Sequence, residues 1–213
     1  MSSSSIVIVT RCIGVSQGPK GRGVILSYHG RRLQGREAAR GLFAGAEADI
    51  AGPVLNAPHK PRCDVRIRRA RLRDLDSLIE LEHRVFATDR LSRRSLRHLL
   101  ASPSAEVLVA EEAGRFAGTA VALFRTGSAL ARLYSLAVAP HMAGRGIASM
   151  LLDAVENRAR ARKCRAIRLE VHQSNRRAIS RYRKSGYRKF GRYPGYYEDG
   201  GHALRFEKPV TAT

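Results

Sequence analysis

The stretch Ala143-Gly144-Arg145-Gly146-Ile147-Ala148 decides the fold, because the apolar pattern of the chain changes its period there. Before it, residues 130–138 alternate as a strand does, and after it apolar residues recur at helical spacing over 147–159. A helix start carries unpaired backbone N–H groups and a partial positive charge, and glycines let a pyrophosphate approach that backbone. A purely structural strand-to-helix turn would have the same residues, and the turn matches neither a Walker loop nor a complete dinucleotide fingerprint.

Outward from this turn, the periodicity predicts an α/β fold with the element order βααβββαβαββ. Strands are predicted at 65–67, 107–112, 116–124, 130–138, 166–172, 187–193 and 203–206. The first predicted helix carries apolar residues over 75–85, and the second begins at Ser92 and ends near Pro103. After the glycine turn and its helix, Asn175 can cap a last helix, and Gly186 suits the left-handed position that ends it.

Three further segments carry a resemblance to a known family. Residues 133–140 read LYSLAVAP, residues 169–175 read LEVHQSN, and residues 178–187 read AISRYRKSGY. Together with the glycine turn they resemble the GNAT acetyltransferase superfamily, and within it the ribosomal-protein alanine N-acetyltransferase group. The resemblance covers residues 64–208. It implies the GNAT fold, a mixed and mostly antiparallel central sheet flanked by helices, and acetyl-CoA as cosubstrate.

The resemblance also implies where acetyl-CoA binds. The backbone of Leu136, Ala137 and Val138 would pair with the pantetheine arm like an added strand, which satisfies amides removed from water. The turn and first helical residues would hold the pyrophosphate. The implied cofactor-binding residues are Leu136, Ala137, Val138, Gly144, Arg145, Gly146, Ile147, Ala148, Ser149 and Asn175. The chain departs from the family at Ala143, where the superfamily commonly has Gln or Arg.

Acetyl transfer to an amine needs a base, because an aliphatic ammonium must lose a proton before it can attack. Glu170 alternates with apolar neighbours on its strand, which by itself fits a solvated glutamate paired with arginine; the resemblance implies the general base. Tyr182 lies on an inward helical stripe, where packing is the ordinary role, and the resemblance implies the general acid for the leaving thiolate. His172 could be a second base or a surface residue. Cys164 fits an ordinary helix-end residue better than a nucleophile.

The function that this resemblance implies is an acetyl-CoA-dependent N-acetyltransferase acting on a primary amine, first of all a protein N-terminal α-amine or a lysine. Glu82, Tyr193, Tyr196 and Tyr197 match regions that border the acceptor in similar enzymes, although packing explains them equally well. Two alternatives stay open: a small-molecule amine acetyltransferase, and a basic nucleic-acid- or ribosome-binding module on a decayed GNAT fold. We expect no metal, and either a monomer or a homodimer.

Composition limits the remaining possibilities. The chain carries 39 Lys and Arg against 18 Asp and Glu, a formal charge of +21. Because arginine is spread along the chain, this favours ordinary solvated surface, and contact with nucleic acid or the ribosome stays open. No run approaches the roughly 20 apolar residues that cross a bilayer, so we expect a soluble protein without membrane contact. Cys12, Cys63 and Cys164 are far apart, which argues against disulfides and a zinc site and favours the cytoplasm.

The domain boundaries follow from a change of pattern near residue 63. Residues 1–62 are rich in Gly, Ser and Pro and keep no amphipathic period, so we expect a disordered or loosely structured N-terminal extension. A transit peptide is a second interpretation of this stretch, because acidic residues are scarce in it. The acetyltransferase domain is expected over 63–208, and residues 209–213 form a C-terminal tail.

Overall fold

The computed structural model describes residues 10–11, 64–86, 90–197 and 199–210. The strands are β1 (Thr10–Arg11), β2 (Arg66–Arg69), β3 (Ala105–Glu112), β4 (Arg115–Phe124), β5 (Leu130–Val138), β6 (Ala166–His172), β7 (Arg188–Tyr193) and β8 (Ala203–Pro209). The α-helices are α1 (Leu75–Val85), α2 (Arg93–Ala101), α3 (Ile147–Ala161) and α4 (Arg176–Lys184), and two short 3-10 helices are η1 (Leu72–Asp74) and η2 (Pro140–Met142). From β2 onward this is the predicted order of strands and α-helices.

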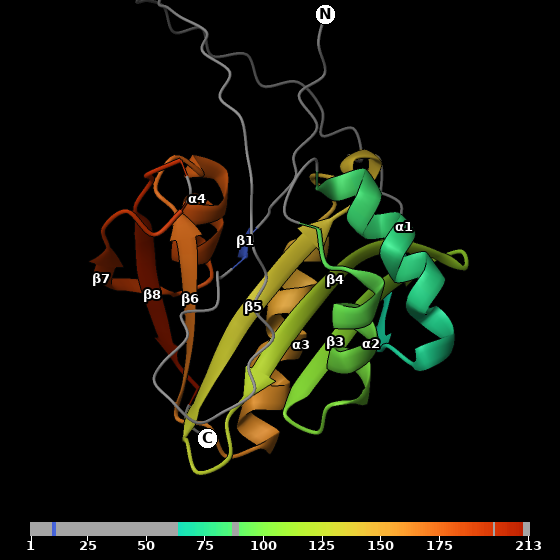
Figure 1. The fold of residues 1–213 in the computed structure, drawn as a ribbon, viewed down its shortest axis with the longest axis horizontal. Coiled ribbons are helices and arrows are strands. Elements are labelled where there is room, and N and C mark those ends of the chain that lie inside the picture. The colour runs from blue at the N-terminus through green and yellow to red at the C-terminus, as the bar shows by residue number, and fades with distance from the viewer. Residues whose placement is uncertain (1–9, 12–63, 87–89, 198, 211–213) are drawn as a thin grey trace, which may run out of the picture.

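The strands form one sheet in the order β2-β3-β4-β5-β6-β8-β7, and β1 pairs with β5 off this path. All neighbours are antiparallel except β5 and β6, which run parallel. Helices α1 and α2 lie over one face of β3 to β5, and α3 lies behind the same strands on the other face (Figure 1). The mixed, mostly antiparallel sheet flanked by helices is the predicted fold.

The central strands are apolar without alternation because helices cover both of their faces. Val107, Leu108, Val109 and Ala110 are at most 2% exposed, and their neighbours from α1 and α2 on one side and α3 on the other complete two apolar clusters. Burial of such side chains is worth roughly 1.5–3 kcal/mol each. This covered part of the sheet fixes β5, the strand from which the glycine turn departs.

The predicted helix ends are confirmed by their capping contacts. The Ser92 hydroxyl accepts a hydrogen bond from Ser95 N at 3.1 Å, and the Asn175 amide oxygen accepts one from Ala178 N at 3.0 Å. Gly186 has φ of 85°, the left-handed conformation that ends α4. At the C-terminal end, β8 continues through Pro209, and Val210 N donates to Arg165 O at 2.9 Å.

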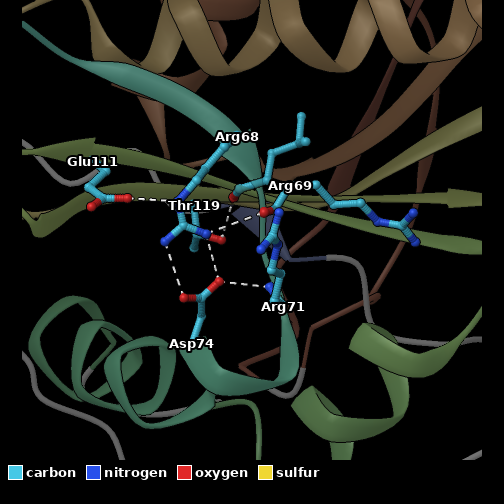
Figure 2. Close-up of polar contacts among 7 residues, drawn as sticks. Arg68, Arg69, Arg71, Asp74, Glu111 and Thr119 are labelled. Atoms are coloured by element: carbon cyan, nitrogen blue, oxygen red, sulfur yellow. Dashed lines mark hydrogen bonds and ion pairs between the residues drawn. The ribbon is translucent and has the colours of Figure 1, made fainter.

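The outer corner of the sheet is held by ion pairs around Arg68 (Figure 2). Its guanidinium donates to both oxygens of Asp74, at 2.7 and 3.1 Å, and through Nε to Glu111 at 2.7 Å. The backbone N–H of Arg71 also donates to Asp74, at 2.7 Å. These hydrogen bonds, with Arg68 foremost, hold the pKa of Asp74 below its usual value. The corner therefore ties β2, η1 and β3 together.

Candidate active site

Strands β5 and β6 pair only at one end. Their parallel register joins Leu130–Arg132 with Ala166–Arg168, and from there the two strands separate (Figure 1). Beyond this point β6 continues to pair with β8, and β5 with β4. We call the separated part the β5–β6 opening. Here the facing edges of β5 and β6 do not pair with each other, and an added strand or a ligand can take up their hydrogen bonds.

Strand β1 lies in the β5–β6 opening. It pairs antiparallel with β5, with Thr10 opposite Leu136 and Arg11 opposite Ser135, and it also contacts β6. Leu136 is one of the three residues whose backbone, by the family resemblance, is expected to pair with pantetheine. The structure thus places part of the N-terminal segment on that backbone edge. The remaining residues of 1–62 lie outside the described part of the chain.

The glycine turn has the geometry that a helix-start anion site requires. Gly144 and Gly146 have φ of 82° and 81°, a left-handed conformation in which any residue with a side chain is strained. Gly146 is the N-cap of α3. No side chain caps this helix end, and its first turn contains no acidic residue. The first backbone N–H groups of an α-helix have no intrahelical acceptor. The turn can therefore offer main-chain donors and the positive end of a 15-residue helix dipole to an anion.

Two arginines flank this turn. Arg145, which the sequence analysis places beside the pyrophosphate, forms an ion pair with Glu112 on β3, with Nη1 2.9 Å from Oε2. Arg181, which the sequence analysis missed, donates from Nη1 to the Ser149 hydroxyl in the first turn of α3 at 2.8 Å. The Nε atom of Arg181 is buried and has no hydrogen-bond partner. Its position three residues after Ala178 on the same side of α4 is the signal that could have found it.

Glu170 is 4% exposed and lies on β6, two residues after Arg168, which is the last residue that pairs with β5. Arg132 reaches it from β5, with Nε and Nη2 at 3.0 and 2.9 Å from the same oxygen, Oε2. Arg205 Nε stands 3.8 Å from the other oxygen, Oε1, beyond hydrogen-bond distance. Arg132 therefore anchors one side of the carboxylate across the start of the β5–β6 opening. Sequence reasoning missed Arg132, which lies 38 residues from Glu170.

Tyr182 is fully buried in α4. Its ring meets Tyr187 edge-on at a centroid distance of 5.8 Å and Phe206 at 6.4 Å, so its ring belongs to the core. Asn175 makes the capping bond described above, and Ala178 between them is also fully buried.

The three tyrosines predicted to border the acceptor come together at the end of β7 and just after it. Tyr193 and Tyr196 stack at 5.5 Å, and Tyr197 meets Tyr196 at 5.2 Å. The Tyr196 hydroxyl accepts from Arg132 Nη2 at 3.4 Å, which connects this group to Glu170. Glu82, in contrast, is 2% exposed and accepts from Leu91 N at 3.0 Å, a contact that joins α1 to the residue before the cap of α2.

The other candidate groups have structural partners. His172 Nε2 lies 3.1 Å from Asp199, and its Nδ1 lies 2.6 Å from the Ser174 hydroxyl. The pKa of Asp199 is lowered, first by the N–H of Gly201 and then by His172. Burial raises the pKa of the Cys164 thiol, which makes it a poor nucleophile, whereas Cys12 and Cys63 lie outside the described residues. Within the described ranges, no three His, Cys, Asp or Glu side chains are grouped to hold a metal, and no helix has the length and apolarity to span a membrane.

Comparison with known proteins assigns the family. The sequence profile of the Acetyltransferase (GNAT) family matches residues 72–187. A Bacillus subtilis protein provisionally named a ribosomal protein bS18-alanine N-acetyltransferase is 28% identical over 135 residues, which cover 63% of this chain and 88% of that protein. An uncharacterized N-acetyltransferase of Methanocaldococcus jannaschii is 34% identical over 139 residues, which cover 65% of this chain and 87% of that protein.

Solved structures agree in fold. The ribosomal-protein-S18-alanine N-acetyltransferase of Escherichia coli superposes with a TM-score of 0.63 at 22% identity, over 70% of this chain and 96% of that one. Ard1 of Thermoplasma volcanium superposes with a TM-score of 0.62 at 25% identity, over 68% of this chain and 97% of that one. The predicted resemblance is confirmed: the chain belongs to the GNAT family of acetyltransferases and is an acyltransferase.

Proposed function

We propose that this protein transfers the acetyl group of acetyl-CoA to a primary amine, and that the acceptor is a protein N-terminal α-amine or a lysine. The family uses acetyl-CoA as cosubstrate. The observation that carries the proposal is that one strand, β5, lies next to both the glycine turn and the strand that bears Glu170. Its end leads into the uncapped start of α3, and its edge in the β5–β6 opening faces the strand that bears Glu170. The start of α3 suits the phosphates of acetyl-CoA, and the edge that faces Glu170 suits transfer of the acetyl group to the amine.

In the proposed donor site, the pyrophosphate accepts from the backbone N–H groups of residues 144–148 and from the Ser149 hydroxyl, and Arg181 supplies a cation beside Ser149. The buried Nε of Arg181 is a donor that still needs an acceptor, and a phosphate oxygen is one. This arginine compensates for Ala143, the position where the chain lacks the usual Gln or Arg. Pantetheine pairs with Leu136, Ala137 and Val138, and Asn175 contacts the cofactor as well.

Strand β1 and the pantetheine arm would use the same backbone edge at Leu136. Two ladders cannot share one set of N–H and C=O groups. Acetyl-CoA binding therefore requires β1 to leave its place in the β5–β6 opening. The free energy needed to release β1 therefore weakens the apparent binding free energy of acetyl-CoA.

In the proposed reaction, Glu170 takes a proton from the acceptor ammonium, directly or through water. The neutral amine nitrogen attacks the thioester carbonyl carbon, and a main-chain N–H near Val138 polarises the carbonyl oxygen. The carbon–sulfur bond then breaks, and Tyr182 gives a proton to the departing thiolate. The acetylated nitrogen loses its remaining extra proton through water, which returns a proton to Tyr182, and the proton held by Glu170 passes to solvent. Arg132 keeps the Glu170 carboxylate oriented through Oε2. The amine gains the acetyl group, and CoA leaves as the thiol.

The tyrosines 193, 196 and 197 form the acceptor side in this proposal, because Tyr196 is linked to Glu170 through Arg132. The relatives named for ribosomal protein alanine acetylation favour a protein N-terminus as the acceptor. We further propose residues 63–208 as the catalytic domain and the cytoplasm as its compartment.

The test is mass spectrometry of a mixed panel of N-terminal peptides, lysine peptides and small amines after incubation with protein and acetyl-CoA. We expect a mass increase of one acetyl group on peptides with a free N-terminus or a lysine, and no increase with the Glu170→Gln variant. Acetylation of small amines alone would replace the protein-acceptor proposal. No acetylation of any amine would overturn acetyl transfer itself.

A further inference from the structure

Helix α4 has two sides with different neighbours. One side carries Ala178, Arg181 and Tyr182, which face the core and Ser149 of α3. The other side carries Arg176, Ser180, Arg183 and Lys184, whose spacing of four, seven and eight residues is that of one helical stripe. The proposed acetyl-CoA site uses the first side only, so the stripe on the second side has no role in it.

This stripe borders a groove. A cavity of about 440 Å³ lies between α4 and β8 and is lined by Arg176, Ile179, Ser180, Arg183, Lys184 and Leu204. Ile179 and Leu204 give it an apolar floor, three cations and a hydroxyl surround it, and none of its lining residues is acidic. Such a groove has the volume and charge for a phosphate-bearing ligand with a flat apolar part.

The basic surface continues onto β7, the edge strand that follows α4. Arg188, Lys189 and Arg192 are exposed on it, and Lys189 and Arg192 pair with Phe206 and Leu204, the β8 residues that face α4. Phe190 lies on the other face of the sheet edge. It is 41% exposed, and the guanidiniums of Arg168 and Arg205 lie 5.0 and 4.5 Å from its ring centroid. Residues 173–197 contain eight cations and no Asp or Glu: Arg176, Arg177, Arg181, Arg183, Lys184, Arg188, Lys189 and Arg192. We call the groove and this strand the α4–β7 surface.

We propose that the α4–β7 surface binds single-stranded polynucleotide, with the phosphodiester backbone passing from the arginines and lysines of the groove around the β7 edge and a base on Phe190. Positive charge beside an aromatic platform is the combination that recognises unpaired nucleotides. A bilayer fits less well, because in the described residues the large exposed apolar side chains are Phe190 and Leu72, and Leu72 belongs to η1. The proposal does not rest on acetyl transfer, since binding is measured without acetyl-CoA.

The experiment is fluorescence anisotropy of a labelled 12-nucleotide uridine RNA, and of the matching thymidine DNA, with the full-length protein across a salt series. The test variant is Arg183→Gln/Lys184→Gln/Arg188→Gln. The control is Arg94→Gln/Arg97→Gln/Arg125→Gln, which removes the same charge from exposed arginines elsewhere. We expect the test variant to raise Kd at least tenfold and to lower the salt slope by about 2, since each lost phosphate contact removes about 0.7 for a single strand. The control should stay within twofold.

A second variant, Phe190→Ala, separates base stacking from charge. We expect it to raise Kd about fivefold or more while leaving the salt slope unchanged. Equal weakening by the test and control variants would mean that only net charge matters, and would overturn the proposal. Displacement of the RNA by acetyl-CoA would also overturn it, because the groove would then belong to the cofactor. Vesicles of phosphatidylglycerol are tested in parallel. If the test variant lost vesicle binding and kept RNA binding, the surface would be assigned to a membrane. Retained melting temperature and acetyl-CoA affinity establish that the variants are folded.

Discussion

Asp74 and Glu170 are both buried carboxylates that pair with arginine, and they differ in how the arginine holds them. At the β2–β3 corner, Arg68 donates to both oxygens of Asp74, and the Arg71 backbone adds a third hydrogen bond (Figure 2). At the β5–β6 opening, both nitrogens of Arg132 donate to a single oxygen of Glu170. The first arrangement closes a corner between three elements. The second anchors a carboxylate where the two strands have separated, and this position is the reason that Glu170 is the proposed base.

The largest effect is expected from Glu170→Gln. If the carboxylate removes the proton from the acceptor, kcat should fall by about 10²–10⁴-fold, while the Kd for acetyl-CoA changes less than about twofold. The control is Glu207→Gln, which changes the same residue type on the neighbouring strand, where Glu207 is paired with Arg168. Steady-state kinetics and calorimetry measure both quantities. Equal kcat values for the two variants would remove Glu170 from the chemistry.

The matching change at the corner is Asp74→Asn, which should affect stability and leave kcat unchanged. We expect the free energy of unfolding at pH 7 to fall by about 1–3 kcal/mol, because charged hydrogen bonds to Arg68 are lost. Folding lowers the pKa of Asp74, so its contribution is present above the unfolded value of about 4 and disappears as the pH falls through the folded value. The difference between wild type and variant in urea unfolding should therefore shrink below pH 4.

Asp76→Asn is the control for that experiment. Asp76 also pairs with an arginine, Arg93 at 2.6 Å, but its side chain is 79% exposed. An exposed pair is worth about 0–1 kcal/mol, so little change is expected. Similar losses for the two variants would show that the buried corner has no special importance.

A smaller effect is expected from Arg181→Met, which removes the cation beside Ser149. The Kd for acetyl-CoA should rise about tenfold, as loss of one charged hydrogen bond predicts. Arg183→Met, on the other side of α4, should leave that Kd unchanged. If Arg183→Met weakened acetyl-CoA binding as much as Arg181→Met, the two sides of the helix would not have separate roles.

The smallest effect is expected at β1. The double variant Thr10→Pro/Arg11→Pro in the full-length chain removes both backbone N–H groups of this strand. Because β1 occupies the edge at Leu136, the variant should lower the Kd for acetyl-CoA by a few-fold. Prolines at Ser2 and Ser3 provide the control. An unchanged or higher Kd would indicate that β1 does not compete with the cofactor.

Local pattern was enough to predict the order of helices and strands and the position of the glycine turn, whereas the arrangement of the sheet came from the family resemblance. The change from period two to helical period at Gly144–Gly146, the caps at Ser92 and Asn175, and the left-handed Gly186 are all short-range signals, and each is present in the structure. Roles for Glu170 and Tyr182 came from the resemblance, because burial and packing of a single residue cannot be read from spacing.

The partners of the site residues could not be predicted because they come from distant parts of the chain. Arg132 and Glu170 are 38 residues apart, and Arg181 and Ser149 are 32 apart. Such contacts depend on which strands are neighbours in the sheet, and periodicity does not carry that information. The pairing of β1 with β5 spans a still longer separation, and nothing in the composition of residues 1–62 indicates it.

The central claim is that the glycine turn at the start of α3 binds the phosphates of acetyl-CoA, and isothermal titration calorimetry of Gly146→Glu tests it most directly. Gly114→Glu is the control, because Gly114 also has a positive φ, 75°, and lies in the turn between β3 and β4. We predict that wild type and Gly114→Glu bind acetyl-CoA, and that Gly146→Glu gives no heat of binding although its stability matches that of Gly114→Glu. Binding retained by Gly146→Glu, or absent from the wild type, would contradict the account.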